Sequence, residues 1–323
     1  MIPDTWFLDA QQRIGKYITT TPLIYDPDND IYLKCENQQV TGSFKARGAL
    51  NKVLSLQTWE KERGLVTASA GNHGLGVAYA GKIVGAHVKV FVSDQAVPTK
   101  IEAIRELNAE IYEVCGGYGE TENEGKTYAI HHGATWISPY NDGQVIAGQS
   151  TICLEILLQN PELISASWVI PVGGGGLISG IGAVLKDKHL NLPFKDPQNP
   201  DYPKIIGVQS LASPFMYTFF RSGSQANIVE LPSIADGLSG PVEKGSITFP
   251  IVKKVVDDFI LVSEEEIAQA IKYAWQKYTQ RIEGSSGAAL ATILASKLND
   301  RPVVIILSGG NIQPELHQQI LKS

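Results

Sequence analysis

The sequence contains little cysteine, no excess of basic charge and no long apolar run. Its three cysteines, Cys35, Cys115 and Cys153, are odd in number, widely spaced and outside any Cys-x-x-Cys pair. A disulfide framework and a structural zinc site are therefore excluded, and a reducing cytoplasmic setting is expected. The longest uncharged stretch, residues 168–185, holds six glycines and one proline, which makes it a poor membrane span.

Basic residues are outnumbered, with 27 Lys and Arg against 33 Asp and Glu, and none of them form a cluster. The net charge of −6 excludes a long-range attraction to nucleic acid or to an anionic membrane. We therefore expect neither as a partner. The N-terminus has acidic residues where a secretory signal needs a basic start, and its apolar residues recur at helical spacing instead.

Glycine, by contrast, is abundant. The chain has 31 glycines, whereas average usage of roughly 7% predicts about 23, an excess of about eight. Short β-branched runs alternate with helix-like segments, which predicts doubly wound open α/β sheets. The strand candidates are 65–69, 88–92, 110–114, 135–137, 168–172, 205–208, 259–262 and 303–307. That number suggests two sheets with a ligand in the crevice between them.

Two further signals concern helices and loops. Ser263 and Glu266 have the spacing of a capping box, and Ile267, Ala274 and Trp275 belong to the apolar stripe predicted behind it. One long polar loop is predicted at 191–203, where proline recurs and apolar residues are few.

Two of four candidate motifs precede helices in the first quarter of the chain. In residues 41–48, Lys45 lies between small and apolar residues, where burial would make its amine available for Schiff-base chemistry. An ordinary helix-start lysine is the alternative on local sequence alone. In residues 67–74, small residues around Asn72 allow a helix N-terminus to face a carboxylate. The alternative there is a plain turn, with His73 a structural histidine.

The other two motifs follow strands later in the chain. Residues 171–180 contain four consecutive glycines, Gly173–Gly176, whose N–H groups can surround a phosphate at a helix start. No Gly-Lys-Ser/Thr follows, so the segment is not a Walker A loop. Ser308 ends the last apolar strand, where ligands bind in open sheets.

Together and in this order, the four motifs resemble the fold type II pyridoxal-phosphate enzymes, in the threonine/serine dehydratase and serine racemase branch. The resemblance extends from about Thr21 to Asn311. It implies two doubly wound open-sheet domains with the cofactor in the interdomain cleft. Residues 1–52 and 143–323 would form the large cofactor-binding domain, and residues 53–142 the small domain that carries the Asn loop.

The resemblance also assigns roles in binding pyridoxal 5'-phosphate. Lys45 would form the Schiff base, Phe44 would pack near the cofactor, Asn72 would bind the ring hydroxyl and Ser308 the pyridine nitrogen. The phosphate would be held by Gly173, Gly174, Gly175, Gly176 and Leu177. The substrate carboxylate would be received by Ser69, Ala70, Gly71, Asn72 and His73.

The implied reaction is α,β-elimination of a β-hydroxy amino acid, L-threonine or L-serine first, to a 2-oxo acid and ammonia. The neutral Ser308 agrees with this, because weaker charge delocalisation into the ring suits β-elimination. Alternatives are threo-3-hydroxyaspartate or a bulky β-hydroxy amino acid as substrate, β-replacement as in cysteine synthesis, and a regulatory amino-acid-binding protein.

This chain differs from the racemase-like members of the family at two positions, one of which bears on racemisation and the other on metal binding. Ala70 stands where those racemases have a serine, and alanine cannot transfer a proton, which disfavours racemisation. Their metal-binding carboxylates are missing after Gly207-Val208, where this chain has Gln209, so no metal is expected. Relatives of this kind are homo-oligomers, and a dimer is expected here.

Overall fold

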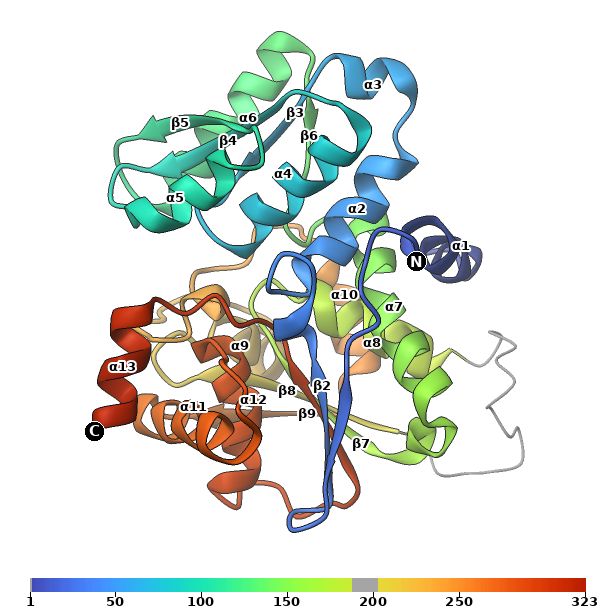
Figure 1. The fold of residues 1–323 in the computed structure, drawn as a ribbon, viewed down its shortest axis with the longest axis vertical. Helices are drawn as coiled ribbons and strands as arrows, with labels where there is room; N and C mark the ends of the chain where they lie inside the picture. Colours follow the sequence, from blue (N-terminus) through green and yellow to red (C-terminus); the bar gives the residue numbers. More distant parts are fainter. Residues whose placement is uncertain (1, 188–202) are drawn as a thin grey trace.

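The computed structural model describes residues 2–187 and 203–323 of the chain. It contains two β-sheets, one above the other in Figure 1, with helices on both faces of each. The prediction of two open, mostly parallel sheets is confirmed. The polar loop predicted at 191–203 lies outside the described residues except for Pro203.

The larger sheet has six strands in the order β1-β2-β10-β7-β8-β9. The strand β1 is antiparallel to β2, and the other neighbours are parallel. Every residue of β7 and β10 is buried, as expected for parallel strands covered on both faces. The strands are β1 (Leu23–Asp26), β2 (Ile31–Cys35), β7 (Ser167–Pro171), β8 (Lys204–Ser210), β9 (Asp258–Val262) and β10 (Val303–Leu307).

The smaller sheet has four parallel strands in the order β5-β4-β3-β6. They are β3 (Leu65–Ala68), β4 (Val88–Ser93), β5 (Glu110–Val114) and β6 (Thr135–Trp136). All of them fall within the predicted small domain of residues 53–142, whose boundaries stay a prediction.

Helices fill the intervals between strands. They are α1 (Thr5–Ile14), α2 (Lys45–Ser55), α3 (Thr58–Glu62), α4 (Asn72–Val84), α5 (Pro98–Arg105), α6 (Tyr118–His132), α7 (Gly143–Gln159), α8 (Gly176–Lys186), α9 (Phe215–Ser222), α10 (Thr248–Val255), α11 (Glu264–Tyr278), α12 (Gly284–Leu294) and α13 (Pro314–Lys322). Short 3-10 helices are η1 (Glu36–Gln38), η2 (Pro161–Ser165) and η3 (Asp236–Leu238).

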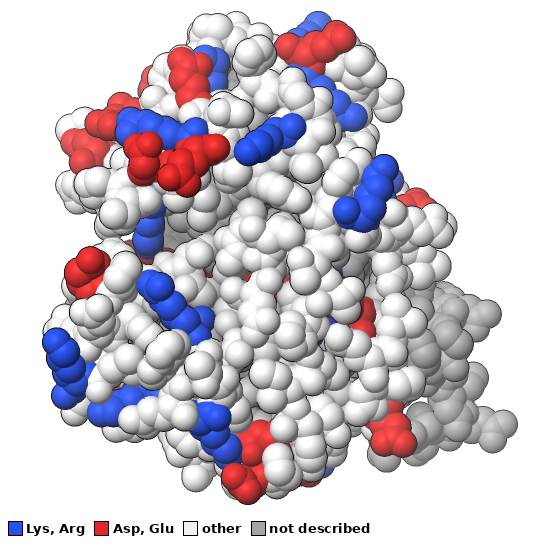
Figure 2. Space-filling model, viewed as in Figure 1, with Lys and Arg blue, Asp and Glu red and all other residues white. Residues whose placement is uncertain are grey.

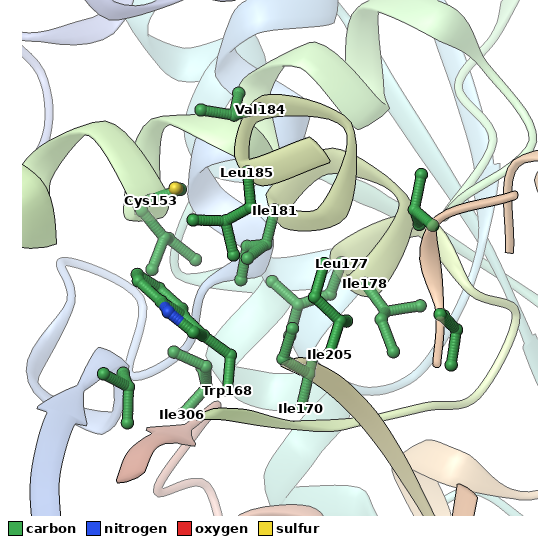
Figure 3. Close-up of a cluster of buried hydrophobic side chains, with 14 of the residues drawn as sticks. Cys153, Trp168, Ile170, Leu177, Ile178, Ile181, Val184, Leu185, Ile205 and Ile306 are labelled. Atoms are coloured by element: carbon green, nitrogen blue, oxygen red, sulfur yellow. The ribbon is translucent and has the colours of Figure 1, made fainter. Parts of the chain in front are cut away.

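The core of the larger unit consists of two apolar layers separated by the sheet. Alternate residues of a strand point to opposite faces, so Trp168 packs with α7 and α8 while Val169 packs with α11 and α12. Figure 3 shows the first layer, with Trp168 beneath Cys153 of α7 and Leu185 of α8. This packing fixes the start of α8 relative to the end of β7.

The smaller sheet is covered by α4 and α5 on one face and by α6 on the other. Helix α2 packs against both α4 and α7, and so it joins the two units. On the face shown in Figure 2, basic and acidic side chains lie side by side at several places above and below an uncharged middle region. Within the described residues, no helix combines the length and the apolarity that a membrane crossing requires.

All eight predicted strands are present, with ends that differ by no more than two residues. The predicted capping box is also present, because Ser263 Oγ accepts from Glu266 N and the Glu266 carboxylate accepts from Ser263 N. Trp275 was wrongly placed in the buried stripe: its side chain is 40% exposed and lies edge-on to His317 of α13. The strands β1 and β2 were not predicted from the sequence.

Candidate active site

The motif loops lie where the strand order of each sheet reverses. From β3 the chain passes to β4 and β5 and then returns to β6 on the other side of β3. From β7 it passes to β8 and β9 and returns to β10 in the same way. Ligand sites of open α/β sheets form outside the carboxyl ends of strands at such reversals. The loops after β3, β6, β7 and β10 are therefore the expected walls of one site.

Lys45 is the first residue of α2, and its amine reaches the loop after β6. Its Nζ donates a hydrogen bond of 3.0 Å to the carbonyl oxygen of Pro139, and the centroid of the Phe44 ring lies 5.3 Å from Nζ. Loss of hydration lowers the pKa of the Lys45 amine to about 8, although the charge of Glu283 opposes this shift. The amine is therefore neutral, and nucleophilic, at a lower pH than an ordinary lysine.

The four glycines, Gly173–Gly176, form the turn from β7 into α8. Gly175 has a φ of +85°, which L side chains rarely adopt, and a Cβ on Gly174 would lie 2.2 Å from the ring of Tyr140. The N–H groups of the four glycines donate no hydrogen bond to another described residue. They lie at the start of an 11-residue helix, whose first turn is anchored by the buried Leu177. Free N–H groups at a helix N-terminus suit a bound phosphate.

Two adjacent residues connect the Lys45 amine to this glycine loop. Pro139 accepts the hydrogen bond from Lys45, and the next residue, Tyr140, packs its side chain against Gly174 and Gly176. The Tyr140 hydroxyl in turn accepts from the N–H of Glu243 at 2.9 Å. Tyr140 was not predicted from the sequence, because a single aromatic residue after a short strand gives no distinguishing signal.

Ser308 lies directly after β10 and is 1% exposed. Its carbonyl oxygen accepts from the N–H of Phe44 at 3.0 Å, which ties it to the residue before Lys45. Its hydroxyl oxygen lies 3.4 Å from that of Ser286 in α12. The side chain offers a neutral hydroxyl that can both donate and accept.

Asn72 is held from two sides at the start of α4. Its Nδ2 donates to both carboxylate oxygens of Glu283 at 2.9 Å, and its Oδ1 accepts from Asn311 Nδ2 at 2.6 Å. Because Glu283 precedes α12, these bonds join the two units. Burial raises the pKa of the Glu283 carboxyl to about 7, against the lowering effect of the Asn72 hydrogen bond. Glu283 was not predicted as a site residue, since in the local sequence it is one acidic residue at a helix start.

In the loop before Asn72, backbone N–H groups and not side chains are the main groups that could bind a ligand. Ser69 Oγ accepts from the N–H of Gly71 at 3.2 Å, whereas the N–H groups of Ala70, Asn72 and His73 donate to no other described residue. The ring of His73 turns into the core, where its Nε2 lies 3.0 Å from the carbonyl oxygen of Ile137. A carbonyl only accepts, so Nε2 carries the proton. Burial lowers the pKa of His73 to about 3, and the ring stays neutral.

Short contacts therefore connect Lys45 with Phe44, with Ser308 and, through Tyr140, with the glycine loop. Asn72 is held beside Glu283 and Asn311, and the His73 ring bonds the carbonyl oxygen of Ile137. A family model described as pyridoxal-phosphate dependent enzyme matches residues 14–309. The chain belongs to this family. The predictions of the family, of an enzyme and of pyridoxal 5'-phosphate as cofactor are confirmed.

Similar proteins cover almost the whole chain. The L-threonine ammonia-lyase of Thermotoga maritima is 38% identical over 322 residues, which covers 97% of this chain and 76% of the relative. The serine racemase of Dictyostelium discoideum is 37% identical over 325 residues, with 97% and 96% covered. The solved structure of maize serine racemase has a TM-score of 0.86 at 30% identity and covers 98% of this chain and 96% of its own.

The residues present fit a pyridoxal phosphate. The Lys45 amine is available for a Schiff base because its pKa is lowered to about 8. The unpartnered N–H groups of Gly173–Gly176 suit the phosphate, and the buried hydroxyl of Ser308 suits a ring nitrogen.

Proposed function

We propose that this protein is an ammonia-lyase that converts a β-hydroxy amino acid, L-threonine or L-serine, to a 2-oxo acid and ammonia. The observation that carries the proposal is the amine of Lys45, which is desolvated, held by the Pro139 carbonyl and linked through Tyr140 to a phosphate-binding glycine loop. The activity of the threonine ammonia-lyase relative agrees with it.

In this proposal the residues of the chain bind the substrate and move one proton. When bound, pyridoxal phosphate supplies an aldehyde for the substrate amine and an electron-withdrawing ring that stabilises negative charge at Cα. The free N–H groups at the start of α4 receive the substrate carboxylate. Asn72, held by Glu283 and Asn311, presents its amide to the ring hydroxyl.

The proton bound to Cα is taken by the neutral amine of Lys45. The β-hydroxyl then departs as water: the C–O bond breaks as the Cα–Cβ double bond forms, and the proton removed from Cα balances the one that leaves with the hydroxyl. Hydrolysis of the released enamine gives the 2-oxo acid and ammonia, so atoms and charges balance. Because Ser308 is neutral, it does not hold a proton on the ring nitrogen, which favours elimination over transamination.

Racemisation is the second candidate, favoured by the serine racemase relative. It requires a proton donor on the side of Cα opposite Lys45. Ala70 supplies only a methyl group at the loop where a hydroxyl would serve this purpose. Elimination is therefore the better supported reaction.

A substrate panel distinguishes these functions. The holoenzyme is incubated with L-threonine, L-serine, threo-3-hydroxyaspartate and a bulky β-hydroxy amino acid, and 2-oxo acid, ammonia and the chirality of the remaining amino acid are measured. We expect equal amounts of 2-oxo acid and ammonia with no D-isomer. Racemised substrate without 2-oxo acid, or no product from any substrate, would contradict the proposal.

The proposal also covers the domain boundaries, the oligomeric state and the cellular location of the protein. The large domain would comprise residues 1–52 and 143–323 and the small domain residues 53–142, with the cofactor between them. We propose a cytoplasmic homodimer, which sedimentation of the holoenzyme would test.

A further inference from the structure

A pair of opposite charges bridges the two units beside the candidate site. Lys100 lies in the first turn of α5, in the unit of the smaller sheet, and Asp236 is the first residue of η3, in the other unit. The Lys100 Nζ lies 2.8 Å from Asp236 Oδ2. The side chain of Lys100 is 25% exposed and that of Asp236 is 64% exposed, so solvent reaches both partners of the pair.

The position of η3 places this pair next to the cofactor loops. The carbonyl oxygen of Gly237 lies 3.0 Å from where a Cβ on Gly173 would be, so η3 packs against the start of the glycine loop. A Cβ on Gly237 would lie 2.8 Å from Ser285 Oγ, a buried hydroxyl without a hydrogen-bond partner among the described residues. The turn that carries Asp236 therefore lies between the glycine loop and the start of α12.

The charges of Lys100 and Asp236 both affect the pKa of the Glu283 carboxyl group. After burial and the Asn72 hydrogen bond, the next influences on the pKa of Glu283 are Asp236, which raises it, and Lys100, which lowers it. Lys100, Asp236 and Glu283 are therefore close enough to interact electrostatically around Asn72. Lys100 is already paired with Asp236, which offsets the effect of its charge on Glu283.

A charged substrate side chain on this side of Asn72 would be affected by this balance. An unpaired lysine at this position would attract a second substrate carboxylate, as a 3-hydroxyaspartate would carry. Paired with Asp236, the same lysine offers little net attraction, and an incoming carboxylate also meets the negative oxygens of Asp236 and of ionised Glu283. A neutral side chain meets no such repulsion.

We propose that Asp236 is a specificity-determining residue: by pairing with Lys100 it excludes substrates with a second carboxylate and restricts the enzyme to β-hydroxy amino acids with neutral side chains. This inference rests on the proposed ammonia-lyase function. It decides between β-hydroxy amino acids with neutral side chains and those with a second carboxylate, which the sequence alone does not distinguish.

The test variant is Asp236→Asn, which keeps the size of the side chain and removes its charge. The partly exposed pair contributes little to folding, so the variant is expected to fold. We expect kcat/KM for threo-3-hydroxyaspartate relative to L-threonine to rise about tenfold or more, because the freed Lys100 then attracts the second carboxylate. Adding Lys100→Met to the variant should abolish the gain.

A matched control breaks another ion pair between the two units. Lys126 of α6 lies 2.6 Å from Glu243, which lies between η3 and α10. The variant Glu243→Gln loosens the same two units and leaves Lys100, Asp236 and Glu283 unchanged. For this variant, kcat/KM for threo-3-hydroxyaspartate relative to that for L-threonine should stay within about twofold of the wild-type ratio. An equal rise in both variants would show that loosening, and not the charge of Asp236, is responsible.

Binding provides a readout that does not depend on turnover. L-aspartate and L-asparagine differ in one charge, lack a β-hydroxyl and can be titrated into the holoenzyme by calorimetry. Asp236→Asn should shift the ratio of their dissociation constants toward aspartate by about tenfold. Lys100→Met alone should shift it toward asparagine, which keeps the idea testable should Asp236→Asn not fold.

The outcomes separate the two proposals. No 2-oxo acid from any β-hydroxy amino acid would reject the ammonia-lyase function. Turnover of threonine with an unchanged diacid ratio in Asp236→Asn would reject the role of Asp236 alone, as would a wild-type enzyme that prefers threo-3-hydroxyaspartate.

Discussion

Burial shifts the charge state of three side chains around the candidate site. Lys45 and His73 have lowered pKa values, about 8 and about 3, while that of Glu283 is raised to about 7. In each case the loss of hydration favours the neutral form. For Lys45 the neutral form is the reactive one, whereas for His73 it preserves a structural hydrogen bond to Ile137.

His73 is therefore expected to make the folded state sensitive to acid. Between about pH 6.5 and pH 3 the unfolded chain binds a proton at this residue that the folded chain does not. The free energy of unfolding should thus fall as the pH falls through this window, by at most ~1.4 kcal/mol per pH unit. Urea denaturation of the wild type and of His73→Gln, whose amide can also donate to Ile137, measures the effect.

The difference in unfolding free energy between the two proteins should depend on pH below about 6.5 and be constant above it. A difference that stays constant down to pH 4 would show that the histidine is protonated in the folded protein as readily as in the unfolded one.

The turn from β7 into α8 has no room for a side chain at Gly174. A Cβ on Gly174 would lie 2.2 Å from the Tyr140 ring, so Gly174→Ala must displace Tyr140 or the turn. We expect a loss of about 1–3 kcal/mol in unfolding free energy and weaker cofactor binding. Denaturation and a titration with pyridoxal phosphate followed by absorbance measure the two effects.

Gly119 in α6 is the matched control, because a Cβ there meets nothing within 4 Å. Gly119→Ala should leave cofactor affinity unchanged and stabilise the helix by up to about 1 kcal/mol. Wild-type cofactor affinity in Gly174→Ala would argue against the role of this turn.

The helices, strands and turns differ in how well the local sequence predicts them. The apolar strands β7 and β10 and the glycine-rich turn after β7 carry local signals, and the structure has two strands and a turn into α8 at these places. The strand β2 carries Lys34, a residue typical of a surface. Its amine is buried and bonds the Glu155 carboxylate at 2.5 Å, a pairing across 121 positions that local patterns do not reveal.

The same limit applies to predicting the residues of the candidate site from local sequence. Lys45 and Gly173–Gly176 could be identified from short motifs, whereas Glu283 gains its importance from Asn72, 211 positions away. Tyr140 and the Lys100–Asp236 pair are likewise defined by contacts between distant segments. Sequence patterns reveal groups that act within one turn and miss those that meet across the two sheets.

At the scale of the whole molecule, two sheets meet so that their points of strand reversal face each other. Polar bridges hold this arrangement: Asn72 with Glu283, Lys100 with Asp236 and Lys126 with Glu243. Helix α2 packs on both units and begins with Lys45. The amine is therefore positioned by the relation of the two units and not by one element alone.

In the proposed function, this relation makes Lys45 the residue that binds the cofactor. Borohydride reduction of the holoenzyme, followed by proteolysis and mass spectrometry, locates the lysine that carries it. We predict a label on the peptide containing Lys45 and on no other, absent from Lys45→Arg, which keeps the charge and lacks the nucleophilic amine. A label on a different lysine, or undiminished labelling of Lys45→Arg, would contradict the account.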